Sequence, residues 1–315
     1  MTLSLEDPWR KFERARAHYE PLAREIETFE QSHPYRIRCE VNKQTCQYSF
    51  YVNGLASVGN DWGLRIGDVV HNLRSSLDHL AVLLVALCTG EEPSRIEHVD
   101  FPIFDKPGKF DNWKSNLLGG TSKPKTPVPL LPGYVTRLEE LQPYNAWDPS
   151  IWGAANTGFV ILPWMLERLS NFDNIDKHRS IHPTWHQVEW VPGRFQLPKF
   201  PDGFVMIGSN SSMEPLVEDA QVGGWLFRSP LPLEWQPTQV EMKSAFPLQV
   251  CLNDPSLVKG VREVLGNCFQ AVAGVLNLFE PVFAGTLAPP LPVLSLLPTY
   301  AMRWPSPGTR RPHKA

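Results

Sequence analysis

The chain has 315 residues, 42% of them hydrophobic, which is enough for a sizeable core in one large domain or two small ones. The formal net charge of −3 argues against a nucleic-acid footprint spread over the whole molecule and leaves room only for a local basic patch. No run of about 18 apolar residues occurs, so we expect no transmembrane helix. The first residues also lack the apolar core of a signal peptide.

The five cysteines are scattered, and no two of them have the C-x-x-C spacing of zinc ribbons or thioredoxin-like motifs. Separated thiols in odd number suit a reducing compartment, so we expect a cytoplasmic protein. The lack of a transmembrane run also predicts no membrane partner. The sequence also lacks a dinucleotide fingerprint, a P-loop, a nucleophile elbow and a zinc-protease motif. No cofactor is therefore expected.

Apolar spacing predicts a helix over residues 8–29, with apolar side chains on one face and a kink at Pro21. Residues 35–41 and 46–52 alternate between apolar and polar types, which predicts a β-hairpin with one buried face. A longer helix follows over residues 61–87, and beyond Leu80 it is apolar nearly all round. That half of the helix should be buried.

Residues 91–155 are irregular apart from a short helix at 110–118 and a Lys/Pro loop at 119–132. Another amphipathic helix is expected over 157–175. Later apolar runs separated by Gly, Pro, Asn and Asp predict strands at 185–191, 204–207, 224–227 and 246–252, followed by a helix at 255–279.

These elements predict an α+β fold with a helical core of about four helices, a β-hairpin and a later antiparallel sheet. Residues 1–183 would hold the hairpin and the helical core. Residues 184–280 would form a β-rich part with a closing helix, within the same folding unit. The Pro-rich residues 281–315 read as a mobile tail.

Chemistry is most plausible on the long helix, in the sequence GDVVHNLRSSLDHL at residues 67–80. At about 100° per residue, Leu73, Leu77 and Leu80 form an apolar seam, and a polar face lies away from it. This polar face comprises His71, Asn72, Arg74, Ser75, Asp78 and His79. Polar groups on a helix with buried neighbouring turns must be paired wherever they are covered.

Two interpretations of the polar face remain open. In the structural one, Asp78 pairs with Arg74 at i,i+4, and the other polar residues cap neighbouring loops. In the functional one, an imidazole, a guanidinium and a carboxylate within two turns move a proton and stabilise an oxyanion or a phosphate.

A second cluster, at the end of the helix over 157–175, contains Asp173, Asp176, Lys177, His178 and Arg179. Acidic residues followed by basic ones suit a helix C-terminus, and Asp173 and Lys177 have i,i+4 spacing. In the functional reading, Asp173 or Asp176 orients His71 or His79, or pairs with Arg74, and the two clusters meet.

His178, His182 and His186 are spaced four apart, as metal ligands on one helix are. Pro183 disfavours helix at the residue before it, so the three side chains should not share a helix face. We expect no metal site here.

The chain resembles a family of uncharacterised actinobacterial proteins. The resemblance rests on the HNLRSSLDHL helix, on LQPY at residues 141–144 and on the N-x-DKHR element at residues 174–179. It covers residues 61–179 best and implies no activity.

The spacing of Arg74 and His79 is similar to the R-x4-H motif of HEPN domains, which include metal-independent endoribonucleases that act as dimers. The resemblance implies that Arg74 binds the scissile phosphate and that His79 is a general acid or base. An RNA partner and a homodimer follow from it. Two alternatives stand beside it: a non-enzymatic structural or interaction protein with a buried polar network, and a small-molecule-binding protein using aromatics such as Trp164, Trp185 and Trp190.

Overall fold

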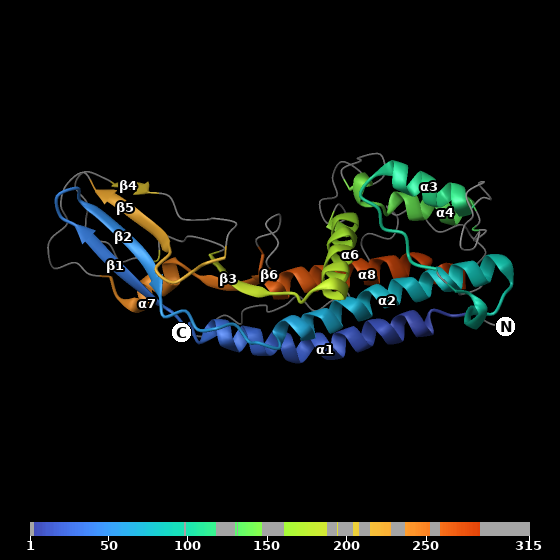
Figure 1. Cartoon of the computed structure of the whole chain (residues 1–315), viewed down its shortest axis with the longest axis horizontal. Helices are drawn as coiled ribbons and strands as arrows, with labels where there is room; N and C mark the ends of the chain where they lie inside the picture. Colours follow the sequence, from blue (N-terminus) through green and yellow to red (C-terminus); the bar gives the residue numbers. More distant parts are fainter. Residues whose placement is uncertain are drawn as a thin grey trace, which may run out of the picture. The chain divides into compact units, whose positions relative to one another are not determined.

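The computed structural model describes residues 3–97, 99–117, 130, 132–146, 161–187, 194, 204–207, 215–227, 237–252 and 259–283. They form long helices and two antiparallel sheets, which confirms the α+β fold. Figure 1 shows these elements along the chain.

The described residues group into two compact units that are discontinuous in sequence. The first draws on Met1–Tyr19, Ile66–Ser180 and Leu265–Ala315, and the second on Glu20–Arg65 and Ile181–Val264. Three long helices contribute residues to both units: α1 (Glu6–Gln31), α2 (Trp62–Thr89) and α8 (Val261–Phe283).

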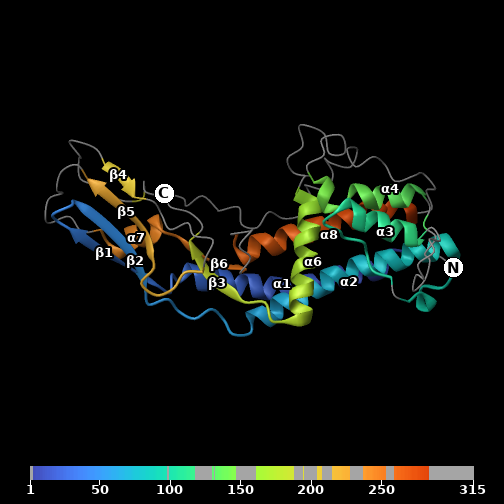
Figure 2. The same ribbon diagram turned by 45° about the horizontal axis from the view of Figure 1, so that its top comes forward.

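In the first unit, stretches of α1, α2 and α8 run side by side, which both views of the ribbon show (Figure 2). The predicted seam at Leu73, Leu77 and Leu80 is fully buried, and the same face is buried from Ile66 to Leu84. The prediction that the helix beyond Leu80 is buried fails at Leu87, which is 39% exposed. Phe12 of α1 meets Phe269 of α8 edge to face, with ring centroids 5.3 Å apart. The core of this unit is therefore apolar helix packing, reinforced by aromatic pairs.

Helix α6 (Ile161–His178) crosses these helices and touches two of them. Near its start, a Cβ placed on Gly274 of α8 would lie 2.8 Å from Leu162 Cδ1, so the two helices approach closely at that glycine. Near its end, α6 reaches α2, as described below. The predicted helix at 157–175 is confirmed over its described part, while residues 151–160 lie outside the described residues.

Two shorter helices complete the first unit, α3 (Pro107–Leu117) and α4 (Pro132–Glu140). Two 3-10 turns, η1 (Pro93–Arg95) and η2 (Pro143–Asn145), belong to the same part of the chain. Helix α3 confirms the short helix predicted at 110–118. Helix α4 was not predicted, and most of the Lys/Pro loop at 119–132 lies outside the described residues.

The second unit contains a four-stranded antiparallel sheet with strand order β1-β2-β5-β4. Its strands are β1 (Arg36–Asn42), β2 (Gln47–Asn53), β4 (Phe204–Ile207) and β5 (Gln221–Phe227). The predicted hairpin is confirmed as β1 and β2, whose turn is held by Asn42 Oδ1 accepting the amides of Gln44 and Thr45. Strand β5 pairs with β2 of the hairpin and β4 pairs with β5, so one sheet contains the hairpin and both later strands.

Helix α7 (Gln239–Ala245), which was not predicted, lies beside β1 and starts with a capping box between Thr238 and Glu241. Phe246, just after this helix, packs on Phe50 of the sheet with ring centroids 5.1 Å apart. A Cβ on Gly223 would lie 2.6 Å from the Phe246 ring, so glycine at this strand position admits the aromatic side chain.

A two-stranded antiparallel ribbon joins β3 (Pro183–Gln187) and β6 (Leu248–Leu252) in the same unit. The carboxylate of Glu30 accepts the Val250 amide at 2.9 Å and pairs with Arg262 at 3.0 Å, which ties α1 and α8 to this ribbon. Both strands were predicted with longer bounds, and residues 188–191 lie outside the described residues.

Helix α8 begins at Val261 rather than at residue 255 and continues to Phe283, beyond the expected end at 279. Residues 253–258 and the Pro-rich stretch from 284 onward lie outside the described residues. Within the part of the chain that the structure describes, no helix combines the length and the apolar character needed to cross a bilayer.

Candidate functional site

Arg74 and Asp78 form an ion pair that also holds the main chain of Phe101. Arg74 Nη2 lies 3.1 Å from Asp78 Oδ1 and donates a 2.7 Å hydrogen bond to the Phe101 carbonyl oxygen. The Phe101 amide donates to Asp78 Oδ1 at 2.9 Å. Only 11% of the Arg74 side chain and 26% of the Asp78 side chain are exposed, so the guanidinium is enclosed by its partners.

The electrostatics of Asp78 reflect this enclosure. Burial raises the pKa of Asp78, while the Arg74 charge and the hydrogen bond from the Phe101 amide pull it back down. Nη1 of Arg74 is buried and has no hydrogen-bond partner among the described residues. The pair therefore depends on both partners remaining in place.

Gln142, of the LQPY element, holds the same segment from its other end. Its Oε1 accepts the Phe104 amide at 2.9 Å, and its Nε2 donates to the carbonyl oxygens of Pro102 and Leu138 at 3.0 and 2.8 Å. The side chain is 1% exposed. The segment from Phe101 to Phe104 is thus fixed by buried side chains at both ends, which satisfies backbone groups that no sheet or helix pairs.

The two sequence clusters meet at Asp173, as the functional reading expected. His71 Nδ1 of α2 lies 3.6 Å from Asp173 Oδ1 of α6, and Lys177 Nζ lies 2.6 Å from Asp173 Oδ2. The carboxylate is 3% exposed, whereas the side chains of His71 and Lys177 are 60% and 52% exposed. The buried carboxylate thus pairs closely with Lys177, while the solvent-facing His71 ring lies near its other oxygen, which has no hydrogen-bond partner among the described residues.

Asp176 lies against the backbone of α2 at Gly67. A Cβ built on Gly67 would lie 2.1 Å from Asp176 Oδ1, so the absence of a side chain is what lets α6 approach here. Burial raises the pKa of Asp176, and the neighbouring carboxylates of Asp173 and Asp68 raise it further, while His71 lowers it. The exposed imidazole of His71 therefore borders an acidic neighbourhood.

Gly67→Ala is expected to lower the free energy of unfolding by about 1–3 kcal/mol, because the methyl group must push the Asp176 carboxylate away. Gly108→Ala in α3 is the matched control, since nothing lies within 4 Å of its Cβ position. That control should be neutral or slightly stabilising. Urea unfolding measures the free energy of unfolding of both variants. If Gly67→Ala is as stable as Gly108→Ala, the close contact with Asp176 is contradicted.

His79 and Arg74, the two residues of the R-x4-H motif, have different surroundings. His79 is half-buried, and burial lowers the pKa of its imidazole. The charge of Lys11 lowers that pKa further and the charge of Asp7 opposes it, so the ring lies near the first turns of α1. The guanidinium of Arg74 instead contacts the Phe101 main chain.

Of the remaining polar residues of α2, Asn72 makes a local bond and Ser76 bonds to the first turn of α1. Asn72 Nδ2 donates to the Asp68 carbonyl oxygen one turn earlier, at 2.7 Å. Ser76, which the sequence reasoning did not include, is fully buried and donates to the Pro8 carbonyl oxygen at 2.8 Å. Ser75 is half-buried. A serine within an apolar helix was the available signal for the Ser76 contact.

His178 and Arg179, at the end of α6, are exposed, and no side-chain ion pair joins them to another described residue. His178 ends α6, His182 is exposed in the following turn, and His186 is buried in β3. Among the described residues, no three His, Cys, Asp or Glu side chains are grouped closely enough to hold a metal ion.

His186 should make folding stability depend on pH. Its ring is 2% exposed, its Nε2 shares a 2.9 Å hydrogen bond with Thr184 Oγ1, and burial lowers its pKa below the usual 6.5. The unfolded chain therefore takes up the proton first as pH falls. The stability that the neutral, buried His186 ring contributes is fully present above about pH 6.5 and is lost as the pH falls below that value.

We expect His186→Gln to lose less stability than the wild type between about pH 7.5 and 5.5 in urea unfolding. His33 and His79, whose pKa values are also lowered by burial, remain in both proteins, so the difference isolates His186. An identical loss in the two proteins would refute this assignment.

The aromatic residues proposed for a small-molecule site have separate settings. Trp185 is 5% exposed, stacks on Phe29 with ring centroids 5.2 Å apart, and donates to the Ala56 carbonyl oxygen. It belongs to the core of the second unit. Trp164 of α6 lies under the guanidinium of Arg168, 5.2 Å from its ring centroid, and Trp190 lies outside the described residues.

No family model, no curated protein and no solved structure matches this chain. The functional argument therefore depends on the geometry of the site itself.

Proposed function

We propose that this protein cleaves RNA by metal-independent acid–base chemistry centred on His71. The observation that carries the proposal is the exposed imidazole of His71 beside the buried carboxylate of Asp173. A carboxylate next to Nδ1 favours the tautomer with its proton on that nitrogen, which leaves Nε2 free to accept one. An exposed imidazole with a buried carboxylate near its inner nitrogen can act as a general base.

In this proposal, His71 accepts the proton of a ribose 2′-hydroxyl while the 2′ oxygen bonds to phosphorus. The bond from phosphorus to the 5′ oxygen breaks, and that oxygen takes a proton from water. Lys177, beside the same carboxylate, would contribute positive charge next to the phosphate. Asp173 acts through His71 and is a positioning residue.

The RNA substrate class comes from the resemblance of Arg74 and His79 to the HEPN motif, and so does the expectation of a homodimer. The proposal gives Arg74 another task and does not place His79 in the reaction. Arg74 would hold the Phe101 segment, because its guanidinium is enclosed. The five free cysteines support a reducing, cytoplasmic setting for the reaction.

The test uses the purified protein with a panel of labelled single-stranded RNAs in excess EDTA, beside DNA oligonucleotides of the same sequences. We expect cleavage of RNA, with 2′,3′-cyclic phosphate ends, and no cleavage of DNA, because the 2′-hydroxyl is the nucleophile. RNA that stays intact at every protein concentration, or cleavage that EDTA abolishes, would refute the proposal. Sedimentation in the same buffer measures whether the protein is a dimer.

A second candidate, a non-enzymatic interaction protein with a structural polar network, is favoured by the bonds of Arg74. Its guanidinium is 11% exposed and is engaged by the Asp78 carboxylate and the Phe101 carbonyl oxygen, as a structural residue would be. This candidate predicts that the His71 site is a surface ion pair without catalytic effect. Intact RNA in the assay above would support it.

A further inference from the structure

Strand β1 of the second unit has an outer edge that no other described strand pairs with. The hydrogen bonds of β2 and its register with β1 show which backbone groups of β1 face that edge. Val52 N–H and C=O bond toward β5 through Ala220 and Asp219, so the facing pair of Ile37 and Val52 is not hydrogen-bonded between β1 and β2. The backbone groups of Ile37, and by alternation those of Cys39 and Val41, therefore point outward.

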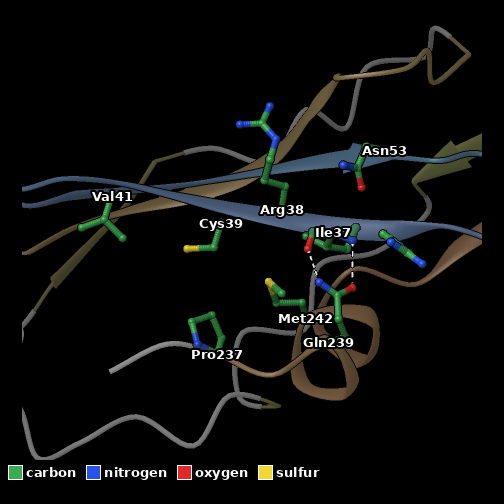
Figure 3. A pocket seen from close by; sticks show the side chains of 9 residues that line it. Ile37, Arg38, Cys39, Val41, Asn53, Pro237, Gln239 and Met242 are labelled. Carbon is green, nitrogen blue, oxygen red and sulfur yellow. Dashed lines mark hydrogen bonds between the residues drawn. The ribbon is translucent and has the colours of Figure 1, made fainter. Parts of the chain in front are cut away.

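The Gln239 side chain already occupies the first of these positions. Its Oε1 accepts the Ile37 amide at 3.1 Å, and its Nε2 donates to the Ile37 carbonyl oxygen at 2.6 Å. The primary amide therefore pairs with the strand edge as a peptide group of another strand would. Figure 3 shows both hydrogen bonds. The outward groups of Cys39 and Val41 form no such pair with another described residue.

A groove of about 360 Å³ follows this open edge. Cys39 and Val41 point to the side of the strand on which Met242 and Pro237 lie, whereas Arg38 points to the other side (Figure 3). Val41 remains 42% exposed, and burial raises the pKa of the Cys39 thiol to about 12, which keeps it neutral. Cys39, Val41, Pro237 and Met242 therefore give this side of the groove apolar side chains, beside polar lining residues such as Asn53 and Gln239.

The opposite face of β1 begins with two arginines, of which Arg38 is paired with carboxylates. Arg36 is exposed and makes no ion pair with another described residue. Arg38 lies over the Tyr51 ring, 4.9 Å from its centroid, and contacts Glu40 and Asp219. A strand added antiparallel to β1 would bring its C-terminal end toward Arg36.

We propose that the edge of β1 binds an extended peptide segment of another protein that alternates apolar residues and ends in acidic ones. The segment pairs with the outward backbone groups of Cys39 and Val41, places its apolar side chains in the groove, and places its acidic end near Arg36. Gln239 stops the added strand at Ile37 and so sets its register. This binding site belongs to the second unit and is independent of the chemistry proposed for His71.

The test measures binding of a fluorescein-labelled peptide, GTVTVEE, to the full-length protein by fluorescence anisotropy. Two control peptides are used: one with both valines N-methylated, and GTVTVKK. We expect each to bind at least about tenfold more weakly, because the first lacks donors to β1 and the second reverses the charge. Equal binding of either control peptide, or no binding of GTVTVEE, would overturn the proposal.

Val41→Pro removes the outward amide, and Val41→Ala keeps it, so these two variants are a matched pair. We expect the alanine variant to bind the peptide and the proline variant to bind at least about tenfold more weakly. If the proline variant fails to fold, the binding of the N-methylated peptide to the wild-type protein tests the proposal instead. Concentration-dependent dimerisation that blocks the peptide would identify a second copy as the occupant and overturn the proposal.

Discussion

Replacement of Asp78 by alanine is expected to lower the free energy of unfolding by about 3–5 kcal/mol, because it leaves a buried guanidinium without its counter-charge. The Arg74 side chain is 11% exposed and would keep the Phe101 carbonyl oxygen as its hydrogen-bond partner. The Phe101 amide would lose its acceptor as well. Chemical denaturation at neutral pH measures the change.

Three further variants separate the causes of this loss. Asp78→Asn keeps an oxygen for the Phe101 amide but removes the charge, so its loss should be smaller than that of Asp78→Ala. Removing both partners in Arg74→Ala/Asp78→Ala should lower stability by less than the sum of the single changes, because no unpaired charge remains. Additive losses for Arg74 and Asp78 would show that the two side chains do not act together.

Gln142→Ala should also destabilise the protein by releasing the Phe104 amide.

His71→Ala is expected to reduce the RNA cleavage rate by about 100- to 10,000-fold, the contribution of a general base. The melting temperature should hardly change, because the His71 side chain is 60% exposed and Asp173 keeps its ion pair with Lys177. The measurement is the single-turnover cleavage rate in EDTA, recorded beside a thermal melt of the same preparation.

His79→Ala is the matched control, since it removes an imidazole two turns away on the same helix. It should leave the cleavage rate close to that of the wild type if His71 is the base. Asp173→Asn should lower the rate and shift its pH profile, because the imidazole then loses the neighbouring charge. A large loss in His79→Ala with full activity in His71→Ala would return the catalytic role to the R-x4-H pair.

Much of the fold was predictable because its elements have strong local signals. The seam of α2 repeats along one face, and the strands of the β1–β2 hairpin alternate clearly. The pairing of β2 with β5 joins residues far apart in the chain, such as Tyr48 and Trp225, and no local pattern encodes it. Helices α4 and α7 are short and carry weak periodicity, so they were missed.

The candidate site was predictable only in part, for a similar reason. The spacing of Arg74 and Asp78 predicted their ion pair, and the i,i+4 spacing of Asp173 and Lys177 predicted theirs. The hydrogen bonds to Phe101 use main-chain atoms, which every residue has, so the sequence contained no sign of them. That His71 would be the histidine beside Asp173 depends on how α6 crosses α2, which periodicity does not specify.

The interleaving of the two units has a consequence for how the protein is made. The first unit requires Met1–Tyr19 at one end of the chain and a stretch starting at Leu265 at the other. At roughly 5–20 residues per second, the ribosome needs on the order of 10–50 s to produce residues 20–264 between them. During that interval the apolar face of the nascent N-terminal helix, with Phe12 and Tyr19, has no partner from the last helix. This apolar face therefore stays without its α8 partner until the residues from Leu265 onward have been made.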